Sequence, residues 1–408
     1  MSRNVTPVEF ADIEAARDRL DDESVVKRTP VERSTSLDEL TGGEVHLKME
    51  HLQWTGSFKT RGAYNKIAQC ADDVDRVVAA SAGNHAQGVA LAATTLGVES
   101  TIVMPRTAPQ AKVDATRGYG ADVELVGTDF REAMAHARGL LDDDTAFVHA
   151  YDDPAIVAGQ GTLGIELYED LPDVDTVVVP IGGGGLISGI ATAFAELSPE
   201  TRVVGVQATG AATVPDSLQK GNPISLESVN TIADGIATGG VSELTLSLIE
   251  EHVDEIVTVT DGDIARAILL LLERAKQVVE GAGAASVAAI ISDSLDVSDE
   301  TVMALLCGGN LDMTMLQTVL VHALTDREQL LRLRVRITDQ PGKMQEISGI
   351  IAEHNANIQT VRHDRSAPEL DVGEAYLVFQ VETSGAGQAR TLIRSIRSHG
   401  YEVSHVNA

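Results

Sequence analysis

The sequence predicts an α/β protein in which parallel sheets are covered by helices, followed by a smaller domain with the order βαββαβ. Between residues 45 and 320, short runs rich in β-branched residues alternate with longer segments of helical periodicity. Glycine occupies 36 of 408 positions, which suits the tight turns between strands and helices. After residue 328 the pattern changes to a two-residue alternation. These observations favour helices on both faces of parallel sheets, and a separate C-terminal domain.

Six strand-like runs give the larger region its order, and most of them end at Gly, Pro or Ser before a helical segment. They are residues 77–80, 101–104, 123–126, 176–179, 203–206 and 302–306. Open α/β sheets bind their ligands at the carboxyl ends of strands. The turns that follow these runs are therefore the place to look for a site.

The smaller domain opens with residues 331–337, where apolar and basic side chains alternate as on a strand with one exposed face. A turn at residues 339–342 leads into a helix, and Asn355 and Asn357 mark the next turn. The expected elements are a helix at 344–353, strands near 358–363 and 375–381, a helix at 388–397 and a strand at 401–406. We place the boundary so that residues 1–327 form the larger region and residues 328–408 the smaller domain.

The charge of the chain argues against two classes of partner. Asp and Glu number 61 against 31 Lys and Arg, a formal net charge of −30. Such a polyanion repels nucleic-acid phosphates and anionic lipids, so we expect neither nucleic acid nor membrane as a partner. The acidic residues are dispersed and lysine is scarce, which favours a halophilic protein from a salt-rich cytoplasm. The alternative is an ordinary acidic protein.

The N-terminus and the cysteines indicate a cytoplasmic protein without a disulfide framework. Residues 1–22 lack the apolar segment of a signal peptide, and no run approaches the ~18 apolar residues of a membrane span. The two cysteines, Cys70 and Cys307, lie far apart and form no CxxC metal pattern.

The first of four candidate elements, residues 55–63, contains Phe58 and Lys59 in a turn that opens a helix. A lysine used for imine chemistry must be neutral at some stage. Partial burial at a positive helix N-terminus would lower its pKa. The alternative is a surface lysine at a helix start.

The second element, residues 81–88, follows the strand that ends at Ala80 and contains Ser81, Asn84 and His85. Its small residues would expose backbone N–H groups at a helix start, where a carboxylate fits. Asn84 could donate a hydrogen bond to a phenolic or carbonyl oxygen. The alternative is a helix cap beside a buried histidine.

The third and fourth elements also follow strands. Gly182, Gly183, Gly184 and Gly185, with Leu186, would bare convergent backbone amides at a helix start and so bind a phosphate. They lack the spacing of a dinucleotide fingerprint or a P-loop, and a flexible turn is the alternative. Cys307, before Gly-Gly-Asn, could meet a ring nitrogen, although a structural buried cysteine is the commoner outcome.

Taken together, these elements describe a site for a phosphorylated aldehyde cofactor, and their order resembles a known family. Ser-Phe-Lys-x-Arg-Gly-Ala, Ser-Ala-Gly-Asn-His-Ala-Gln-Gly, Gly-Gly-Gly-Gly-Leu and Cys-Gly-Gly-Asn resemble the threonine/serine dehydratases of pyridoxal phosphate (PLP) fold type II, over residues 5–324. Residues 331–406, with Asp-Gln-Pro-Gly-Lys-Met at 339–344, resemble an ACT domain of ferredoxin-like fold. This layout is similar to threonine ammonia-lyases with one ACT unit.

The resemblance implies PLP as cofactor and a role for each motif. Lys59 would hold PLP, with Phe58 beside it; Asn84 would bind the 3-oxygen, residues 182–186 the phosphate, and Cys307 the pyridine nitrogen. Ser81, Asn84 and His85 would bind the substrate carboxylate. Glu280 would line the pocket or act only as a helix-start charge. The implied reaction is the deamination of L-threonine to 2-oxobutanoate and ammonia through loss of water, with Lys59 as general base.

Three alternatives stay open: an L-serine dehydratase, a serine racemase, and an inactive amino-acid-binding regulator. Racemases carry a serine where this chain has Ala82, and an alanine cannot move a proton. Cation-binding members carry glutamate and aspartate at the positions of Gln207 and Thr213, so we expect no divalent metal there. The presence of Lys59 argues against an inactive regulator.

The smaller domain would bind a regulatory amino acid. The helix after Pro341 and Gly342 would present free N–H groups to a carboxylate, and Asp339 would meet the ammonium. Asn355 or Asn357 would close this effector site, at the interface between two copies of the domain. If the pathway leads to isoleucine, isoleucine is the expected inhibitor. By family analogy we expect a homo-oligomer, a dimer or tetramer, and the alternative role of the domain is only to join subunits.

Overall fold

The computed structural model describes residues 7–21 and 24–405, and it divides the chain into two compact units after Asp312. Residue 406 of the last predicted strand, and residues 1–6 and 22 of the predicted leaderless N-terminus, lie outside the described residues. The helix α13 (Met313–Asp326) is grouped with the second unit. The boundary that we predicted, after residue 327, falls just beyond this helix.

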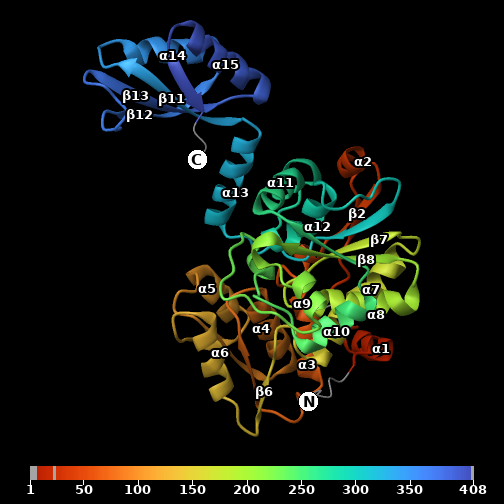
Figure 1. The fold of residues 1–408 in the computed structure, drawn as a ribbon. Coiled ribbons are helices and arrows are strands. Elements are labelled where there is room, and N and C mark those ends of the chain that lie inside the picture. Colours follow the sequence, from red (N-terminus) through yellow and green to blue (C-terminus); the bar gives the residue numbers. More distant parts are fainter. Residues whose placement is uncertain (1–6, 22–23, 406–408) are drawn as a thin grey trace. The chain divides into compact units, whose positions relative to one another are not determined.

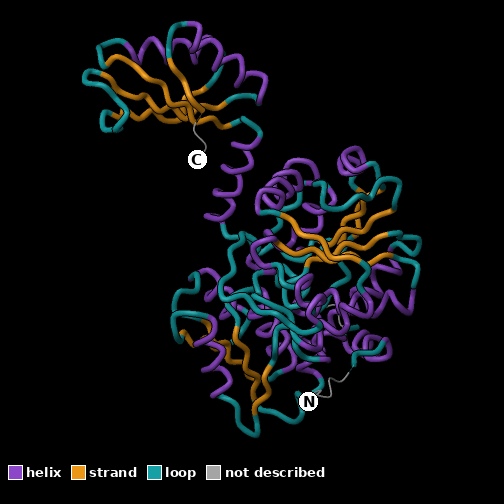
Figure 2. Tube along the Cα trace, viewed as in Figure 1, coloured by secondary structure: helices purple, strands orange, loops and turns teal. Residues whose placement is uncertain are grey.

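The first unit contains two sheets, drawn in orange in Figure 2. The larger has the order β1(Val31–Arg33)-β2(Glu44–Lys48)-β10(Thr301–Leu305)-β7(Thr176–Pro180)-β8(Arg202–Ala208)-β9(Glu255–Val259). The smaller has the order β5(Asp122–Leu125)-β4(Glu99–Met104)-β3(Arg76–Ala80)-β6(Thr145–Phe147). All neighbouring strands are parallel except β1 with β2, so the predicted α/β class with parallel sheets is confirmed.

Helices separate and cover these sheets, as Figure 1 shows. They are α1(Phe10–Arg19), α2(Thr35–Thr41), α3(Lys59–Ala68), α4(Asn84–Leu96), α5(Gln110–Gly118), α6(Phe130–Gly139), α7(Pro154–Asp170), α8(Gly185–Leu197), α9(Val214–Lys220), α10(Glu243–His252), α11(Asp261–Leu270) and α12(Gly281–Ile290). All ten residues of α12 are buried, since the helix packs against β7, β8, β9 and β10. Its small residues allow the helix axis to lie close to the sheet.

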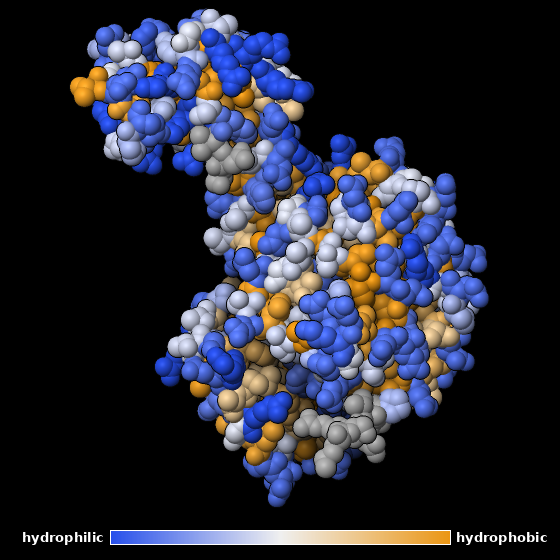
Figure 3. All heavy atoms as spheres, in the orientation of Figure 1, coloured by the Kyte–Doolittle hydropathy of each residue, from blue (hydrophilic) through white to orange (hydrophobic). Residues whose placement is uncertain are grey.

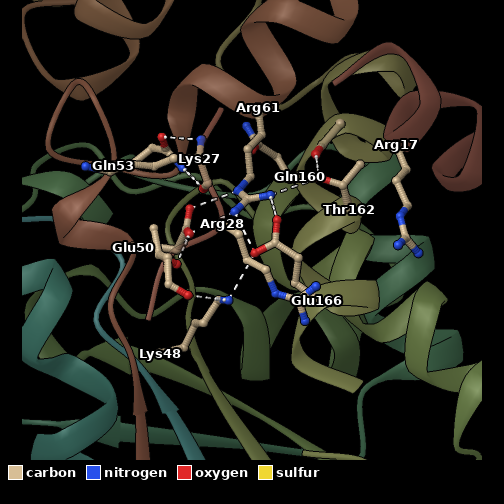
Figure 4. A network of polar contacts seen from close by, with 12 residues as sticks. Arg17, Lys27, Arg28, Lys48, Glu50, Gln53, Arg61, Gln160, Thr162 and Glu166 are labelled. Carbon is tan, nitrogen blue, oxygen red and sulfur yellow. Dashed lines mark hydrogen bonds and ion pairs between the residues drawn. The ribbon is translucent and has the colours of Figure 1, made fainter. Parts of the chain in front are cut away.

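A buried ionic network holds the start of α3 in place (Figure 4). The Arg61 guanidinium, 1% exposed, donates to Glu50 and to Glu166 of α7 at 2.6–3.0 Å. Lys48 of β2, fully buried, pairs with Glu166 at 3.0 Å and Asp170 at 2.8 Å. Burial lowers the pKa of Arg61, but the two carboxylates outweigh this effect and raise it. The network therefore joins β2, α3 and α7 at a point two residues beyond Lys59.

The second unit has the predicted βαββαβ order. Its elements after α13 are β11(Leu330–Thr338), α14(Lys343–Glu353), β12(Asn357–Asp364), β13(Glu374–Glu382), α15(Ala386–Ser398) and β14(Glu402–His405). The antiparallel sheet has the order β12-β13-β11-β14. Along β11, Leu331, Leu333 and Val335 are buried in the core, while arginines alternate with them on the other face. This is the two-residue alternation that the sequence shows.

Hydrophilic side chains are spread over the visible surface of both units rather than gathered in one block (Figure 3). Within the described part of the chain, no helix is both long and apolar enough to cross a bilayer.

Candidate active site

The four candidate elements meet in one pocket of the first unit, although they lie up to 250 residues apart. The pocket is lined by Phe58, Lys59, Asn84, Tyr151, Pro180, Gly182, Gly183, Gly184, Gly185, Leu186, Gly235, Ile236, Thr238, Glu280, Ala282 and Cys307. They meet there because β3, β7 and β10 all direct their carboxyl ends toward it. Lys59 does not follow one of these strands directly, and it reaches the pocket from the first turn of α3.

Lys59 is held in an environment that favours its neutral form. Its Nζ donates to the backbone oxygen of Ala150 at 3.2 Å and lies 5.0 Å from the centre of the Phe58 ring. Burial lowers the pKa of Lys59 to about 8, although Cys307 and Glu280 partly oppose the shift. An amine with this pKa is partly unprotonated near neutral pH and can act as nucleophile or base.

The glycine loop leaves no room for side chains. A Cβ at Gly183 would lie 2.1 Å from the ring of Tyr151, and one at Gly184 would lie 2.8 Å from Thr245. Gly184 has φ +91° and caps α8, while Thr245 Oγ1 donates to the Gly183 carbonyl at 2.8 Å. The pocket wall is therefore bare backbone at the start of a 13-residue helix, which is an environment that binds phosphate.

Asn84, the first residue of α4, reaches the pocket, whereas the side chains of Ser81 and His85 are engaged outside it. Ser81 Oγ accepts from the N–H of Gly83 at 3.2 Å. His85 Nε2 donates to the Val148 carbonyl at 2.9 Å, and burial lowers the pKa of His85 to about 3, so its ring is neutral. If these two residues bind a carboxylate, they do so through the backbone N–H groups at the start of α4.

Cys307 lies at the end of the strand β10 with its side chain 3% exposed. Its Sγ donates to the carbonyl of Ala282 at 3.3 Å, and burial raises the pKa of the thiol. The thiol is therefore neutral and can face a ring nitrogen without protonating it fully. Cys70 is also a free cysteine.

Several pocket residues carry no sequence signal that would have located them. Tyr151 follows β6 in an irregular loop, and its ring meets that of His149 edge-on at 4.8 Å. Gly235 and Ile236 lie in a short 3-10 helix, Asp234–Ile236, and Thr238 follows it, in a segment without a motif. Glu280 is 8% exposed, and burial raises its pKa; it precedes α12, which is the only hint that the sequence offers.

Comparison with known proteins identifies the family. Residues 23–308 match the family described as pyridoxal-phosphate dependent enzyme. The chain belongs to this family. This PLP-dependent enzyme is 46% identical over 399 residues to the L-threonine ammonia-lyase of Thermotoga maritima, covering 97% of this chain and 99% of that protein. It is 42% identical over 395 residues to that of Geobacter sulfurreducens, covering 96% and 98%.

Solved structures share the fold of the PLP-dependent enzyme. The processed threonine deaminase isoform 2 of Solanum lycopersicum has a TM-score of 0.72 at 36% identity, covering 78% of this chain and 96% of that one. Maize serine racemase has the same TM-score at 34% identity, covering 79% and 99%. The predicted PLP fold type II and the predicted cofactor are thereby confirmed.

The residues present fit PLP. A buried lysine with a lowered pKa suits the aldehyde, the bare glycine loop at a helix start suits the phosphate, and a buried neutral thiol suits the ring nitrogen. Each of these groups lines the same pocket, and the lysine and the loop lie on different helices.

Gln207 and Thr213, where we expect no divalent cation, meet at the start of α9. Gln207 Oε1 accepts from the N–H groups of Thr213 and Val214, at 3.0 and 2.9 Å. Over residues 7–21 and 24–405, no group of three or more His, Cys, Asp or Glu side chains is placed to hold a metal ion. The absence of a divalent metal stays a prediction.

The four expected effector residues do not come together within one chain. Asp339 and Gly342 precede α14, whereas Asn355 and Asn357 follow it, and an 11-residue helix separates the pairs by about 16 Å. Asp339 accepts from Arg365 at 2.6 Å, and Asn357 donates to Glu382 at 2.9 Å. The closure of an effector site by Asn355 or Asn357, at the interface between two copies of the domain, stays a prediction.

Proposed function

We propose that this PLP-dependent enzyme is an L-threonine ammonia-lyase, which converts L-threonine to 2-oxobutanoate and ammonia. The observation that carries the proposal is Lys59, buried beside the glycine loop with its pKa lowered to about 8. It is supported by two relatives of this name that align over nearly the full length of both chains. A catabolic L-threonine dehydratase of Staphylococcus aureus is also 44% identical over 324 residues, covering 78% of this chain and 93% of that protein.

Lys59, Cys307 and the start of α4 each have a part in this reaction. Bound PLP withdraws electrons from the substrate Cα, so that the Cα proton can be removed. The N–H groups at the start of α4 bind the carboxylate and orient the Cα–H bond. Lys59 takes the Cα proton as general base, and the ammonium so formed donates a proton to the β-hydroxyl, which leaves as water. The released enamine is hydrolysed to the oxo acid and ammonia, and the neutral Cys307 thiol disfavours competing transamination.

The test is a comparison of kcat/KM for L-threonine and L-serine, with the oxo acid as the measured product. We expect turnover of both and a higher value for threonine. Lys59→Ala should abolish turnover, and borohydride reduction followed by mass spectrometry should place the cofactor on Lys59. Labelling of another lysine would contradict the site. A higher kcat/KM for serine would instead make the protein a serine dehydratase.

Serine racemase is the second candidate, because racemases are among the structural neighbours. Ala82 lies in the turn between β3 and α4 and carries no group that can transfer a proton. We therefore expect no D-serine when the enzyme is incubated with L-serine and the products are separated by chiral chromatography. Formation of D-serine at a rate comparable with elimination would favour the racemase.

We further propose that the second unit, as an ACT domain beginning near residue 328, binds a regulatory amino acid through Asp339 and Gly342. Gly342 has φ +95° and caps α14, so the free N–H groups of that helix start beside it. The hydrogen bond and charge of Arg365 hold the pKa of Asp339 below its usual value. A charged Asp339 suits an ammonium group, with isoleucine as the expected inhibitor.

Calorimetry with isoleucine, valine and threonine tests the regulatory proposal. Asp339→Asn should weaken effector binding, whereas Glu353→Gln, an exposed residue at the far end of α14, should not. If no amino acid binds outside the active site and none changes threonine kinetics, the unit is only structural. Light scattering of the same samples would test the expected dimer or tetramer. The cytoplasmic location stays a prediction.

A further inference from the structure

The side-chain amide of Asn84 is held at both ends by residues from distant parts of the chain. Its Nδ2 donates to Glu280 Oε1 at 2.6 Å, and its Oδ1 accepts from Asn310 Nδ2 at 2.8 Å. Asn84 begins α4, Glu280 caps α12, and Asn310 follows β10. Residues at the ends of two helices and one strand therefore form one series of hydrogen bonds, Asn310–Asn84–Glu280, at the wall of the pocket.

A backbone carbonyl fixes which atoms donate and which accept in this series of hydrogen bonds. Asn310 Nδ2 also donates to the carbonyl of Thr55 at 2.7 Å, and a carbonyl can only accept. This contact decides which end of the Asn310 amide is nitrogen. Asn310 can then offer only an N–H group to Asn84. The Asn84 Oδ1 must therefore accept this hydrogen bond, and its Nδ2 must face Glu280. Without such partners, the two flips of an asparagine amide are nearly equivalent.

One donor of Asn84 is left over. An amide nitrogen has two hydrogens, and the second has no partner in the described part of the chain. Asn84 and Glu280 both line the cofactor pocket. A donor placed there suits the ring oxygen of PLP, whereas the opposite flip would present an oxygen to that oxygen and repel it.

Glycines make room for both partners of Asn84. A Cβ at Gly308 would lie 2.2 Å from Glu280 Oε1, and a Cβ at Gly56, where φ is +72°, would lie 2.6 Å from Asn310 Oδ1. Neither partner could keep its position beside an alanine. The local sequence is thus compatible with this arrangement because positions 56 and 308 are glycines.

We propose that Asn310 and Glu280 are positioning residues that orient Asn84 so that its remaining N–H faces the ring oxygen of PLP. Asn310 supplies a donor that Asn84 can meet only with its oxygen, and Glu280 supplies the acceptor for the other end. The proposal rests on the cofactor of the family and not on threonine as substrate. Its tests therefore use cofactor binding and are independent of the tests of substrate choice.

The first test reverses the donors and acceptors in this series of hydrogen bonds. In Asn310→Asp, the carboxylate can only accept, so it attracts Asn84 Nδ2 and turns Oδ1 toward the pocket. We expect the dissociation constant of PLP, measured by fluorescence titration of the apoenzyme, to rise at least about tenfold, or about 1.4 kcal/mol. The visible absorbance band of the loaded variant should also shift, because the ring oxygen has lost its donor. Asn222→Asp, at an exposed residue of the first unit, makes the same chemical change as a control.

The second test separates the acceptor from mere packing, and it does not depend on the folding of the first variant. Glu280→Gln retains an oxygen that can accept from Asn84, whereas Glu280→Ala removes it. We expect the glutamine variant to bind PLP about tenfold more tightly than the alanine variant, with a band closer to that of the wild type. Circular dichroism of each apoenzyme establishes that it is folded.

Two results would overturn the proposal. One is an Asn310→Asp variant that is folded and binds PLP within twofold of the wild type with an unshifted band. The other is equal loss of affinity in the two Glu280 variants, since this would mean that the oxygen facing Asn84 has no orienting role.

Discussion

The lowered pKa of Lys59 predicts how fast the apoenzyme takes up PLP at each pH. Only the neutral amine attacks an aldehyde. With a pKa of about 8, roughly 10% of Lys59 is neutral at pH 7, compared with about 0.03% at the ordinary value of 10.5. At pH 7 the neutral fraction of Lys59 is therefore about 300 times that of an exposed lysine, and this is its advantage in attacking the aldehyde.

Stopped-flow absorbance measures this advantage directly. Apoenzyme is mixed with PLP between pH 6 and 10.5, and the rate of appearance of the visible band is recorded. We expect the rate to rise about tenfold per pH unit below about 8 and to become level above it, because the neutral fraction follows the pKa. A rate that continues to rise through pH 10 would refute the argument, since it would assign Lys59 an ordinary pKa.

The same pKa makes the stability of the apoenzyme depend on pH. The folded-state pKa lies below the unfolded value, so the unfolded chain binds more protons between pH 8 and 10.5. Stability should therefore rise with pH across this window, and below pH 8 the protonated lysine should cost the full amount of about 3 kcal/mol. Lys59→Met should remove this dependence, which urea unfolding at several pH values would reveal.

Three further predictions concern packing and charge. Glu50→Ala, which leaves the buried Arg61 guanidinium with one carboxylate fewer, should destabilise the protein to urea by about 3–5 kcal/mol, whereas the exposed Glu39→Ala should change little. Gly183→Ala would force a Cβ into the Tyr151 ring and should weaken PLP binding at least tenfold, whereas Gly118→Ala, which meets nothing, should not; equal affinities would contradict the phosphate assignment. Thermal stability should rise from dilute buffer to molar KCl because salt screens the acidic surface, and a flat or falling curve would contradict salt adaptation.

The motifs after strands were the part of the site that could be predicted. Asn84, residues 182–186 and Cys307 each follow an apolar run, and parallel sheets place such positions at one edge. Lys59 was found because its motif is local to a helix start. The alternation of β11 likewise predicted the second unit, because one face of a sheet is buried and the other is not.

What could not be predicted depends on contacts across the fold. Tyr151 covers the glycine loop from an irregular segment, and no periodicity places an irregular segment in space. The sequence did not show whether His85 would meet the substrate carboxylate through its ring or through its backbone N–H; the ring donates to Val148, since a buried ring needs a partner. The sequence predicted the helix between the turns at 339–342 and 355–357 but not how the side chains of the two turns are directed. In each case the missing information was the direction of a side chain or the length of an element.

The negative charge of the chain is divided unequally between the two units. Residues 313–408 contain 10 Lys and Arg against 11 Asp and Glu, so they are nearly neutral, whereas residues 1–312 contain 21 against 50. Self-repulsion in dilute buffer must therefore arise almost wholly within the first unit, which is also the unit that binds PLP. Because the Debye length falls to about 3 Å at 1 M salt, added salt acts on that unit and leaves the second nearly unchanged. Salt should thus stabilise the PLP-binding unit selectively, and the hydrophobic core of the second unit should unfold at a temperature that depends little on salt.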